Sequence, residues 1–150
     1  MSFLTAPAAA ETVVTAYLGQ PATLPCSYPS WSVNSNSMCW GKGPCPNSRC
    51  TEELLHTDGA RVLSRRSTKY DIWGDIKRGN VSLTIFNTKE GDSAVYCCRI
   101  EVPGWFNDIK KNIRLQLRKG EQVKGRMLVE GEVQWLMGNR LGGGGRALAP

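Results

Sequence analysis

The 150-residue chain contains a single histidine, His56, and this scarcity excludes most histidine-dependent catalysis. His56 stands in a polar turn, directly before the letters T-D-G, where a surface position is expected. A side-chain nucleophile also needs a neighbouring base, and one loop histidine does not supply such a pair. The sequence therefore predicts a protein that is not an enzyme.

Long apolar runs and nucleic-acid-binding motifs are also missing from this chain. No stretch reaches the roughly 20 apolar residues of a transmembrane helix. The formal net charge of +6 favours an anionic partner. A membrane leaflet fits that charge, and we expect no nucleic-acid partner because no motif for one is present.

Cysteine is the residue type that the chain has in abundance, with six copies. This number in so short a region indicates disulfides and an oxidising compartment, at the cell surface or outside the cell. Zinc is the competing interpretation, but Cys39, Cys45 and Cys50 contain no C-x-x-C pair and no second cluster accompanies them. Six cysteines allow fifteen pairings, and spacing alone does not choose among them.

Two patterns place the cysteines in an all-β fold. Asp92, Tyr96 and Cys98 form D-x-x-x-Y-x-C, the spacing of the tyrosine corner of a β-sandwich. Cys26, then Trp40 fourteen residues later, then Cys98 form the Cys, Trp, Cys pattern of an immunoglobulin domain, in which the tryptophan packs on the disulfide. The predicted fold is an immunoglobulin β-sandwich.

Strand alternation assigns the remaining cysteines to the outside of this sandwich. Neighbouring side chains of a strand point to opposite faces, so if Trp40 and Cys98 point inward, the cysteine before each of them points outward. Two more bridges can then form on the outer face of the sheet that contains the strand around Trp40 (strand C), the next strand (C′) and the strand around Cys98 (F). The C–C′ and F–G loops follow strands C and F. The cysteines available for these bridges are Cys39, Cys45, Cys50 and Cys97. Such bridges would fold the loop 41–50 against the sheet, next to the F–G loop.

Alternating segments supply the predicted strands. They are residues 11–28, with two strands around a Gly-Gln-Pro turn, and 37–41, 61–64, 70–73, 81–86 and 113–118. The positions expected to point inward are Ala22, Leu24, Cys26, Val81, Leu83 and Ile85. Pro25 should make its strand irregular, because proline cannot donate a hydrogen bond to a neighbouring strand. Core or edge packing is expected for Tyr28, Trp31 and Trp73. The triplet Asn80-Val81-Ser82 is an N-glycosylation acceptor, so a glycan is expected on Asn80.

The sandwich is predicted over residues 11–119, with a segment on either side. Residues 1–10 lack the basic start and apolar run of a signal peptide but end in small residues, so we interpret them as a leader remnant or a replaced leader. Residues 120–150 lose the alternation and are expected to be disordered or weakly helical. The candidates for an amphipathic helix there are Leu128, Val129, Val133, Trp135, Leu136 and Met137.

The segment 102–108, V-P-G-W-F-N-D, combines a Pro-Gly turn, two large aromatic side chains and two oxygen-bearing side chains. A soluble domain gains nothing by solvating Trp105 and Phe106. Either both rings fold back onto the sheet, or the loop is a binding surface.

Together these motifs resemble a known family. The letters S-M-C-W-G-K-G-x-C-P-N-S-R-C at 37–50, V-S-L-T-I at 81–85 and D-S-A-V-Y-C-C-R-I-E-V-P-G-W-F-N-D at 92–108 are similar to the amino-terminal variable domain of the T-cell immunoglobulin and mucin family. The similarity covers about residues 11–119. It implies a variable-type immunoglobulin β-sandwich with disulfides Cys26–Cys98, Cys39–Cys50 and Cys45–Cys97. The family's mucin-like stalk, membrane span and cytoplasmic tail are not found, so anchoring is not indicated.

The resemblance also implies a site. A calcium ion and a phosphatidylserine head group are expected in a cleft between the C–C′ and F–G loops, with Asn107 and Asp108 as metal ligands. The residues expected to meet the head group are Ser48, Arg49 and Asp108, and those expected to enter the bilayer are Trp105 and Phe106. The cations expected to favour an anionic leaflet are Lys42, Arg49, Lys110 and Lys111.

The implied function is that of a cell-surface receptor domain that recognises apoptotic cells for engulfment and takes part in immune regulation. An alternative, from a different class, is a protein-binding immunoglobulin domain. Such a domain would pair with another cell-surface receptor through its C–C′–F–G face.

Overall fold

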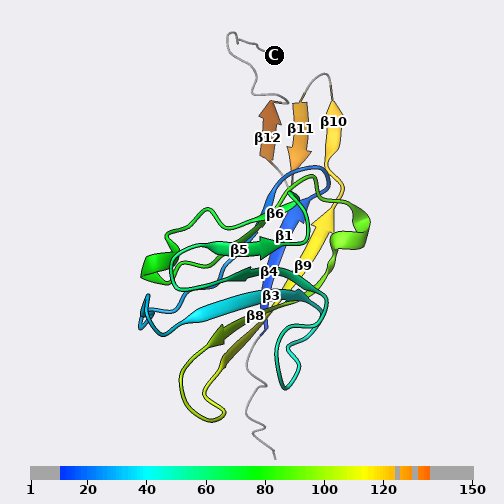
Figure 1. The fold of residues 1–150 in the computed structure, drawn as a ribbon. Helices are drawn as coiled ribbons and strands as arrows, with labels where there is room; N and C mark the ends of the chain where they lie inside the picture. Colours follow the sequence, from blue (N-terminus) through cyan, green and yellow to red (C-terminus); the bar gives the residue numbers. More distant parts are fainter. Residues whose placement is uncertain (1–10, 124–125, 130–131, 136–150) are drawn as a thin grey trace, which may run out of the picture. The chain divides into compact units, whose positions relative to one another are not determined.

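The computed structural model describes residues 11–123, 126–129 and 132–135. The chain divides into two compact units, Met1–Leu117 and Arg118–Pro150 (Figure 1). The predicted leader segment 1–10 lies outside the described residues. In the part of the chain that the structure describes, no helix is long and apolar enough to cross a bilayer.

One layer of the first unit is a six-stranded sheet with the order β1-β9-β8-β3-β4-β5 (Figure 1). In that order the strands span Thr12–Tyr17, Ile109–Arg118, Ala94–Glu101, Ser37–Lys42, Glu53–Thr57 and Val62–Arg65. The pairs from β9 to β5 are antiparallel. Since β8 and β3 are neighbours, the two strands that carry the cysteine motifs lie side by side, with Trp40 opposite Cys98.

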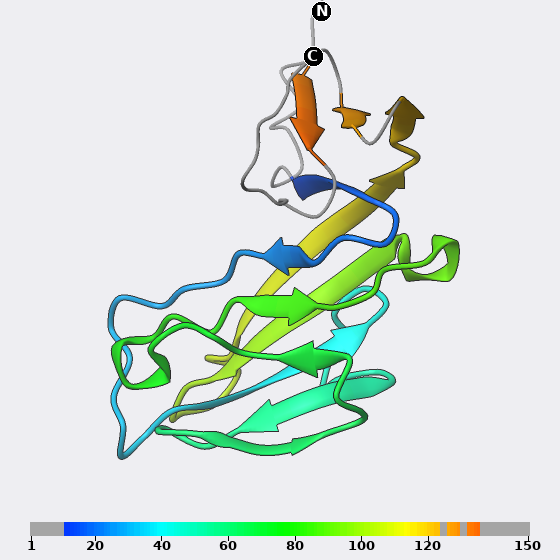
Figure 2. The same ribbon diagram turned by 90° about the horizontal axis from the view of Figure 1, so that it is seen from above.

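The second layer is a three-stranded sheet of β2 (Ala22–Leu24), β7 (Leu83–Ile85) and β6 (Tyr70–Asp71), and the two layers face each other (Figures 1 and 2). Two short 3-10 helices, η1 (Ile76–Arg78) and η2 (Glu90–Asp92), lie in the connections. Strand β2 ends before Pro25, and the Cys26 N–H donates to the Ser82 hydroxyl at 3.1 Å instead of to a strand carbonyl. The irregularity predicted at Pro25 is therefore confirmed.

The core between the layers follows the predicted alternation. Ala22 and Leu24 of β2 and Leu83 and Ile85 of β7 are at most 2% exposed. Each fully buried Leu or Ile contributes about 1.5–3 kcal/mol relative to exposure. Trp40 is fully buried in this core, and its indole N–H donates to the Val81 carbonyl at 2.7 Å.

The tyrosine corner has the predicted form. The Tyr96 hydroxyl donates to the Asp92 carbonyl at 2.6 Å, and Tyr96 is fully buried. Burial, and then the negative charge of Asp92, raise the pKa of the Tyr96 hydroxyl. The phenol therefore keeps its proton, and with it the hydrogen bond, throughout the neutral range.

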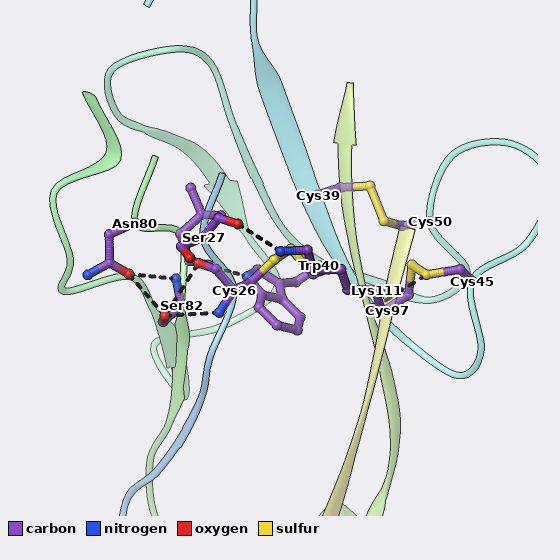
Figure 3. Close-up of a disulfide and its surroundings, with 12 residues drawn as sticks. Cys26, Ser27, Cys39, Trp40, Cys45, Cys50, Asn80, Ser82, Cys97 and Lys111 are labelled. Carbon is purple, nitrogen blue, oxygen red and sulfur yellow. Dashed lines mark hydrogen bonds between the residues drawn. A yellow bond between two sulfur atoms is a disulfide. The ribbon is translucent and has the colours of Figure 1, made fainter. Parts of the chain in front are cut away.

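All six cysteines are paired, as Cys26–Cys98, Cys39–Cys50 and Cys45–Cys97. Figure 3 shows Trp40 beside the first bridge, inside the sandwich, with the other two bridges on the opposite side of the strands. The pairing implied by the family resemblance is thus confirmed, together with the facing argument for the outward cysteines.

The three aromatics assigned to core or edge packing differ in their surroundings. Tyr28 and Trp31 pack against the core, and the Trp31 indole N–H donates to the Gly59 carbonyl at 3.0 Å. Trp73 is 73% exposed and contacts the Phe86 ring, 5.4 Å away between centroids. Of the two placements expected, Trp73 is therefore outside the core and packs at its edge, against Phe86.

The second unit contains strands where a weak helix was one expectation. Strands β10 (Glu121–Val123), β11 (Arg126–Val129) and β12 (Glu132–Trp135) form an antiparallel sheet. The sequence has two residues between consecutive strands, with glycine second, a composition typical of tight hairpins. Leu136 and Met137 lie outside the described residues.

Candidate functional site

The C–C′ loop, between β3 and β4, is stapled to the outer face of the large sheet. The Cys45–Cys97 bridge ties it to β8, and the Cys39–Cys50 bridge ties it to β3. Cys39 and Cys97 are at most 3% exposed although they point away from the core, because this loop covers them. The Cys45 N–H also donates to the Asn112 side chain on β9, at 2.8 Å. The stapling expected from the sequence is confirmed.

Close packing keeps this loop on the sheet. A Cβ placed on Gly41 would lie 2.4 Å from the Thr51 carbonyl oxygen, so the strand admits only glycine where the loop returns. Gly43, Arg49 and Glu52 all have positive φ, at 113°, 61° and 43°. Left-handed backbone at these positions produces the tight turns that bring the loop back.

The F–G loop, between β8 and β9, is closed at its base by Asp108. One carboxylate oxygen of Asp108 accepts from the Val102 N–H at 3.2 Å. Higher in the loop, the Asn107 side-chain amide donates to the Pro103 carbonyl at 2.9 Å. Gly104 has a φ of 113°, and a Cβ there would lie 2.1 Å from the Asn107 amide nitrogen. The loop is therefore internally braced.

The tip of this loop presents its aromatic side chains to solvent. Trp105 is 87% exposed and Phe106 is 99% exposed. Their ring centroids are 6.4 Å apart, so the two rings form one apolar point. The alternative in which both rings fold back onto the sheet does not describe this structure.

A cleft of about 210 Å³ lies between the two loops. It is lined by Asn47, Arg99, Gly104, Phe106, Asp108 and Lys110. Asn47 belongs to the C–C′ loop, and three of the other residues belong to the F–G loop. The expected cleft between these loops is present, and Asp108 and Phe106 lie in its wall.

The other site residues expected from the sequence lie around this cleft. Ser48 and Arg49 are exposed and directly follow the lining residue Asn47 in the chain, but neither is among the lining residues. Asn107 is exposed in the F–G loop, between two lining residues. The structure thus brings the two loops together at the cleft and leaves Ser48 and Arg49 at its margin.

Three of the lining residues, Asn47, Arg99 and Gly104, were missed by the sequence analysis. Of these, Arg99, on β8, makes side-chain contacts with both loops. It is 6% exposed, and its guanidinium bonds to Asp108 of the F–G loop and to two carbonyls of the C–C′ loop. The available signal was its position: alternation places Arg99 on the same outward face as Cys97. Alternation gives only the face, however, and does not show that Arg99 lies under the stapled loop.

The oxygens of the F–G loop fit a hard cation such as calcium. Both Asp108 carboxylate oxygens accept hydrogen bonds, yet a carboxylate oxygen has a further lone pair for a cation. The Asn107 amide donates through its nitrogen, which leaves its carbonyl oxygen as an acceptor. Calcium takes six to eight oxygens. No group of three or more His, Cys, Asp or Glu side chains suited to a metal occurs among the described residues. A calcium ion at this loop would therefore need main-chain carbonyls and a bound ligand to complete its shell.

The lysines expected near the site separate into two groups. Lys110 lines the cleft. The Lys42 ammonium donates to the Gly91 carbonyl at 2.7 Å, and the Lys111 ammonium donates to the Ser27 carbonyl at 2.7 Å. These two ammonium groups are held by main-chain oxygens outside the lining of the cleft, whereas Arg49 is exposed.

The fold and the paired cysteines define the class of protein. A family model described as the immunoglobulin V-set domain matches residues 9–118. The chain therefore belongs to the immunoglobulin V-set family.

The curated relatives place it more narrowly. The chain is 64% identical over 118 residues to T-cell immunoglobulin and mucin domain-containing protein 4 of Mus musculus, which covers 79% of this chain and 34% of the relative. It is 65% identical over 113 residues to the protein of the same name of Homo sapiens, which covers 75% of this chain and 30% of the relative. The chain thus spans about a third of the length of these relatives, and the resemblance to the T-cell immunoglobulin and mucin family is confirmed.

A solved structure described as Tim-4 in complex with phosphatidylserine is similar throughout the first unit's fold. It has a TM-score of 0.71 and 66% sequence identity, and the match covers 71% of this chain and 98% of the solved chain.

Proposed function

We propose that residues 11–119 are the calcium-dependent phosphatidylserine-binding domain of a cell-surface receptor that recognises apoptotic cells for engulfment and takes part in immune regulation. The single observation that supports this most is the F–G loop, where an exposed aromatic tip adjoins a cleft that Phe106 and Asp108 line. The similar Tim-4 structure with phosphatidylserine supports the same assignment. We propose a binding domain and not an enzyme.

The aromatic tip supplies affinity for the bilayer in this proposal. Burying an aromatic side chain of about 150–250 Å² contributes at most about 4–6 kcal/mol. Immobilisation of the domain at the membrane offsets part of that gain. Insertion of Trp105 and Phe106 alone would not select a lipid, because every lipid offers acyl chains.

Selectivity comes from the cleft. Asn107 and Asp108 would hold a calcium ion, which would supply positive charge for the lipid phosphate. Asp108 can also accept from the serine ammonium, while Ser48 and Arg49 at the margin can donate to the serine carboxylate. Because the protein supplies only part of the shell, calcium should bind weakly without lipid and more tightly with it, and the coupling is reciprocal.

Asn80 is the proposed glycosylation site. Its side chain is exposed, and its amide oxygen accepts from the Ser82 hydroxyl at 2.9 Å (Figure 3). The side-chain nitrogen of Asn80, which would carry the glycan, is therefore turned away from the Ser82 hydroxyl. This segment leads into β7 of the smaller sheet, so a glycan there leaves the loop cleft of the larger sheet accessible.

Vesicle sedimentation tests the proposed function. The purified domain should bind vesicles of phosphatidylcholine with phosphatidylserine in millimolar calcium and should lose that binding with a chelator. Asp108→Ala should abolish calcium-dependent binding, because it removes the carboxylate of the proposed metal site. Asp75→Ala, an exposed carboxylate on the η1 connection, is the control.

If the unmodified domain does not bind these vesicles in millimolar calcium, the proposed function is wrong. Binding to another cell-surface receptor through the same sheet would then be the function to examine.

A further inference from the structure

Arg99 occupies the junction between the two loops. It lies on β8, opposite Cys39 of β3 and Lys110 of β9, and its side chain is only 8% exposed. Removing a guanidinium from water is costly unless its donors are paired. The hydrogen-bond partners of the Arg99 guanidinium therefore show which segments it holds in place.

Three hydrogen bonds connect Arg99 to both loops. Its Nε donates to the Asp108 carboxylate at 3.1 Å. Its Nη1 donates to the Pro46 carbonyl at 2.9 Å, and its Nη2 donates to the Asn47 carbonyl at 3.0 Å. The two carbonyls are consecutive main-chain groups, so the guanidinium fixes the backbone of the C–C′ loop relative to the F–G carboxylate.

The disulfides do not replace this contact. They hold the C–C′ loop at Cys45 and Cys50, whereas residues 46–49 lie between these anchors. Residues 47–49 are exposed, and Asn47 lines the cleft. Arg99 therefore holds the middle of the loop, where the cleft wall and the proposed head-group residues are.

The same contact orients Asp108. One carboxylate oxygen is held by Arg99 and the other by the Val102 N–H. A carboxylate held in this way loses little further freedom when a ligand binds, which favours affinity.

We propose that Arg99 is a positioning residue that sets the spacing of the two loops and the orientation of Asp108, and thereby the lipid selectivity of the cleft. This inference rests on the proposed function. Arginine suits the task because its planar fork reaches three acceptors at once, whereas a lysine ammonium is a point charge on a flexible stem. The guanidinium acts through the loops, without itself touching the lipid.

Arg99→Lys tests this role because it keeps the charge and loses the fork. The full chain is assayed in calcium with phosphatidylcholine vesicles that contain either phosphatidylserine or phosphatidylglycerol at equal mole fraction. Arg114→Lys is the matched control: Arg114 lies on β9 and pairs with Glu11, with a 44% exposed side chain, so the swap is the same but remote from the cleft.

We expect Arg99→Lys to lose about tenfold or more in binding to phosphatidylserine vesicles, the ratio expected for one lost charge-assisted hydrogen bond. Binding to phosphatidylglycerol vesicles should stay near the parent level, because the net charge is unchanged. Arg114→Lys should match the parent on both lipids. Loss of selectivity is a result that mere loss of folded protein would not produce.

The inference is wrong if the Arg99→Lys protein keeps the parent's preference for phosphatidylserine vesicles. It is also wrong if binding to the two kinds of vesicle weakens by the same factor. Arg99→Gln is the second variant, in case the lysine variant does not fold. If neither gives a folded monomer by size exclusion and near-ultraviolet circular dichroism, Arg99 serves the fold and not the site, and the inference fails. If the parent protein binds neither kind of vesicle, both the proposed function and this inference are wrong. That outcome differs from the ones above, in which the parent binds and only the variant result contradicts the role of Arg99.

Discussion

Removing the aromatic tip of the F–G loop is the change that separates membrane insertion from head-group recognition. In the variant Trp105→Ala with Phe106→Ala, two side chains that are 87% and 99% exposed are cut back to methyl groups. Because both rings contact mainly each other and solvent, the free energy of unfolding should change by no more than about 0.5 kcal/mol.

The expected loss of vesicle binding follows from the area of the rings. Complete burial of two such side chains has an upper limit of about 8–12 kcal/mol at about 25 cal/mol per Å². A loop tip inserts only partly and alanine retains some apolar area, so we expect a loss of about 3 kcal/mol. This corresponds to roughly a hundredfold weaker binding.

Two assays measure this loss. Sedimentation with phosphatidylserine vesicles in calcium reports insertion together with head-group binding. Titration with a soluble short-chain phosphatidylserine, kept below its micelle concentration, reports head-group binding alone. That binding should weaken far less than vesicle binding, with a small loss because Phe106 also lines the cleft. Trp73→Ala is the control, because Trp73 is also an exposed tryptophan, at 73%, but lies outside this loop.

Equal losses in the two assays would refute the insertion role, since the tip would then be part of the head-group site. Wild-type vesicle binding by the double variant would refute it as well. A loss of the same size in Trp73→Ala would show that exposed aromatics act without regard to their position.

Three further predictions concern the framework and the surface. Tyr96→Phe removes the buried hydrogen bond to the Asp92 carbonyl and should lower the free energy of unfolding by about 1–3 kcal/mol in urea titrations; an unchanged midpoint would contradict this. Burial and Asp92 raise the Tyr96 pKa, so this tyrosine contributes stability that is complete below the ordinary tyrosine pKa of about 10 and is lost as the pH rises above it. Between about pH 8 and pH 11, the midpoint temperature of thermal unfolding should therefore fall less steeply with rising pH for Tyr96→Phe than for the parent. Asn80→Gln should remove a glycan from protein expressed through a secretory pathway and should leave vesicle binding unchanged. Electrophoretic mobility before and after treatment with a deglycosylating enzyme measures this. If the mobility of the parent protein does not change on treatment, Asn80 carries no glycan and the prediction is wrong.

The sandwich was predictable from the sequence because its determinants are local or follow the period of a strand. The spacing of Asp92, Tyr96 and Cys98 predicts the corner, and alternation predicts that Cys97 points outward from the sheet. The placement of Trp105 and Phe106 was left open by the sequence, between rings folded back onto the sheet and an exposed binding loop, and the structure decided it.

The cleft itself needed the tertiary structure. Arg99 and the carbonyls of Pro46 and Asn47 are about fifty residues apart in the chain, and their contacts exist only because two disulfides fold the C–C′ loop over the sheet. Nothing in the periodicity around Arg99 distinguishes it from a solvated surface arginine.

The same distinction applies elsewhere in the chain. Trp73 is exposed because β6 ends at Asp71, and Lys42 turns to the Gly91 carbonyl because the fold brings that oxygen within reach. Residue type and period determined which face of a strand each side chain takes. The partner that a polar or aromatic group meets on that face was decided by contacts between distant segments, because a hydrogen bond or ion pair depends on positions within a few tenths of an ångström that no local pattern encodes.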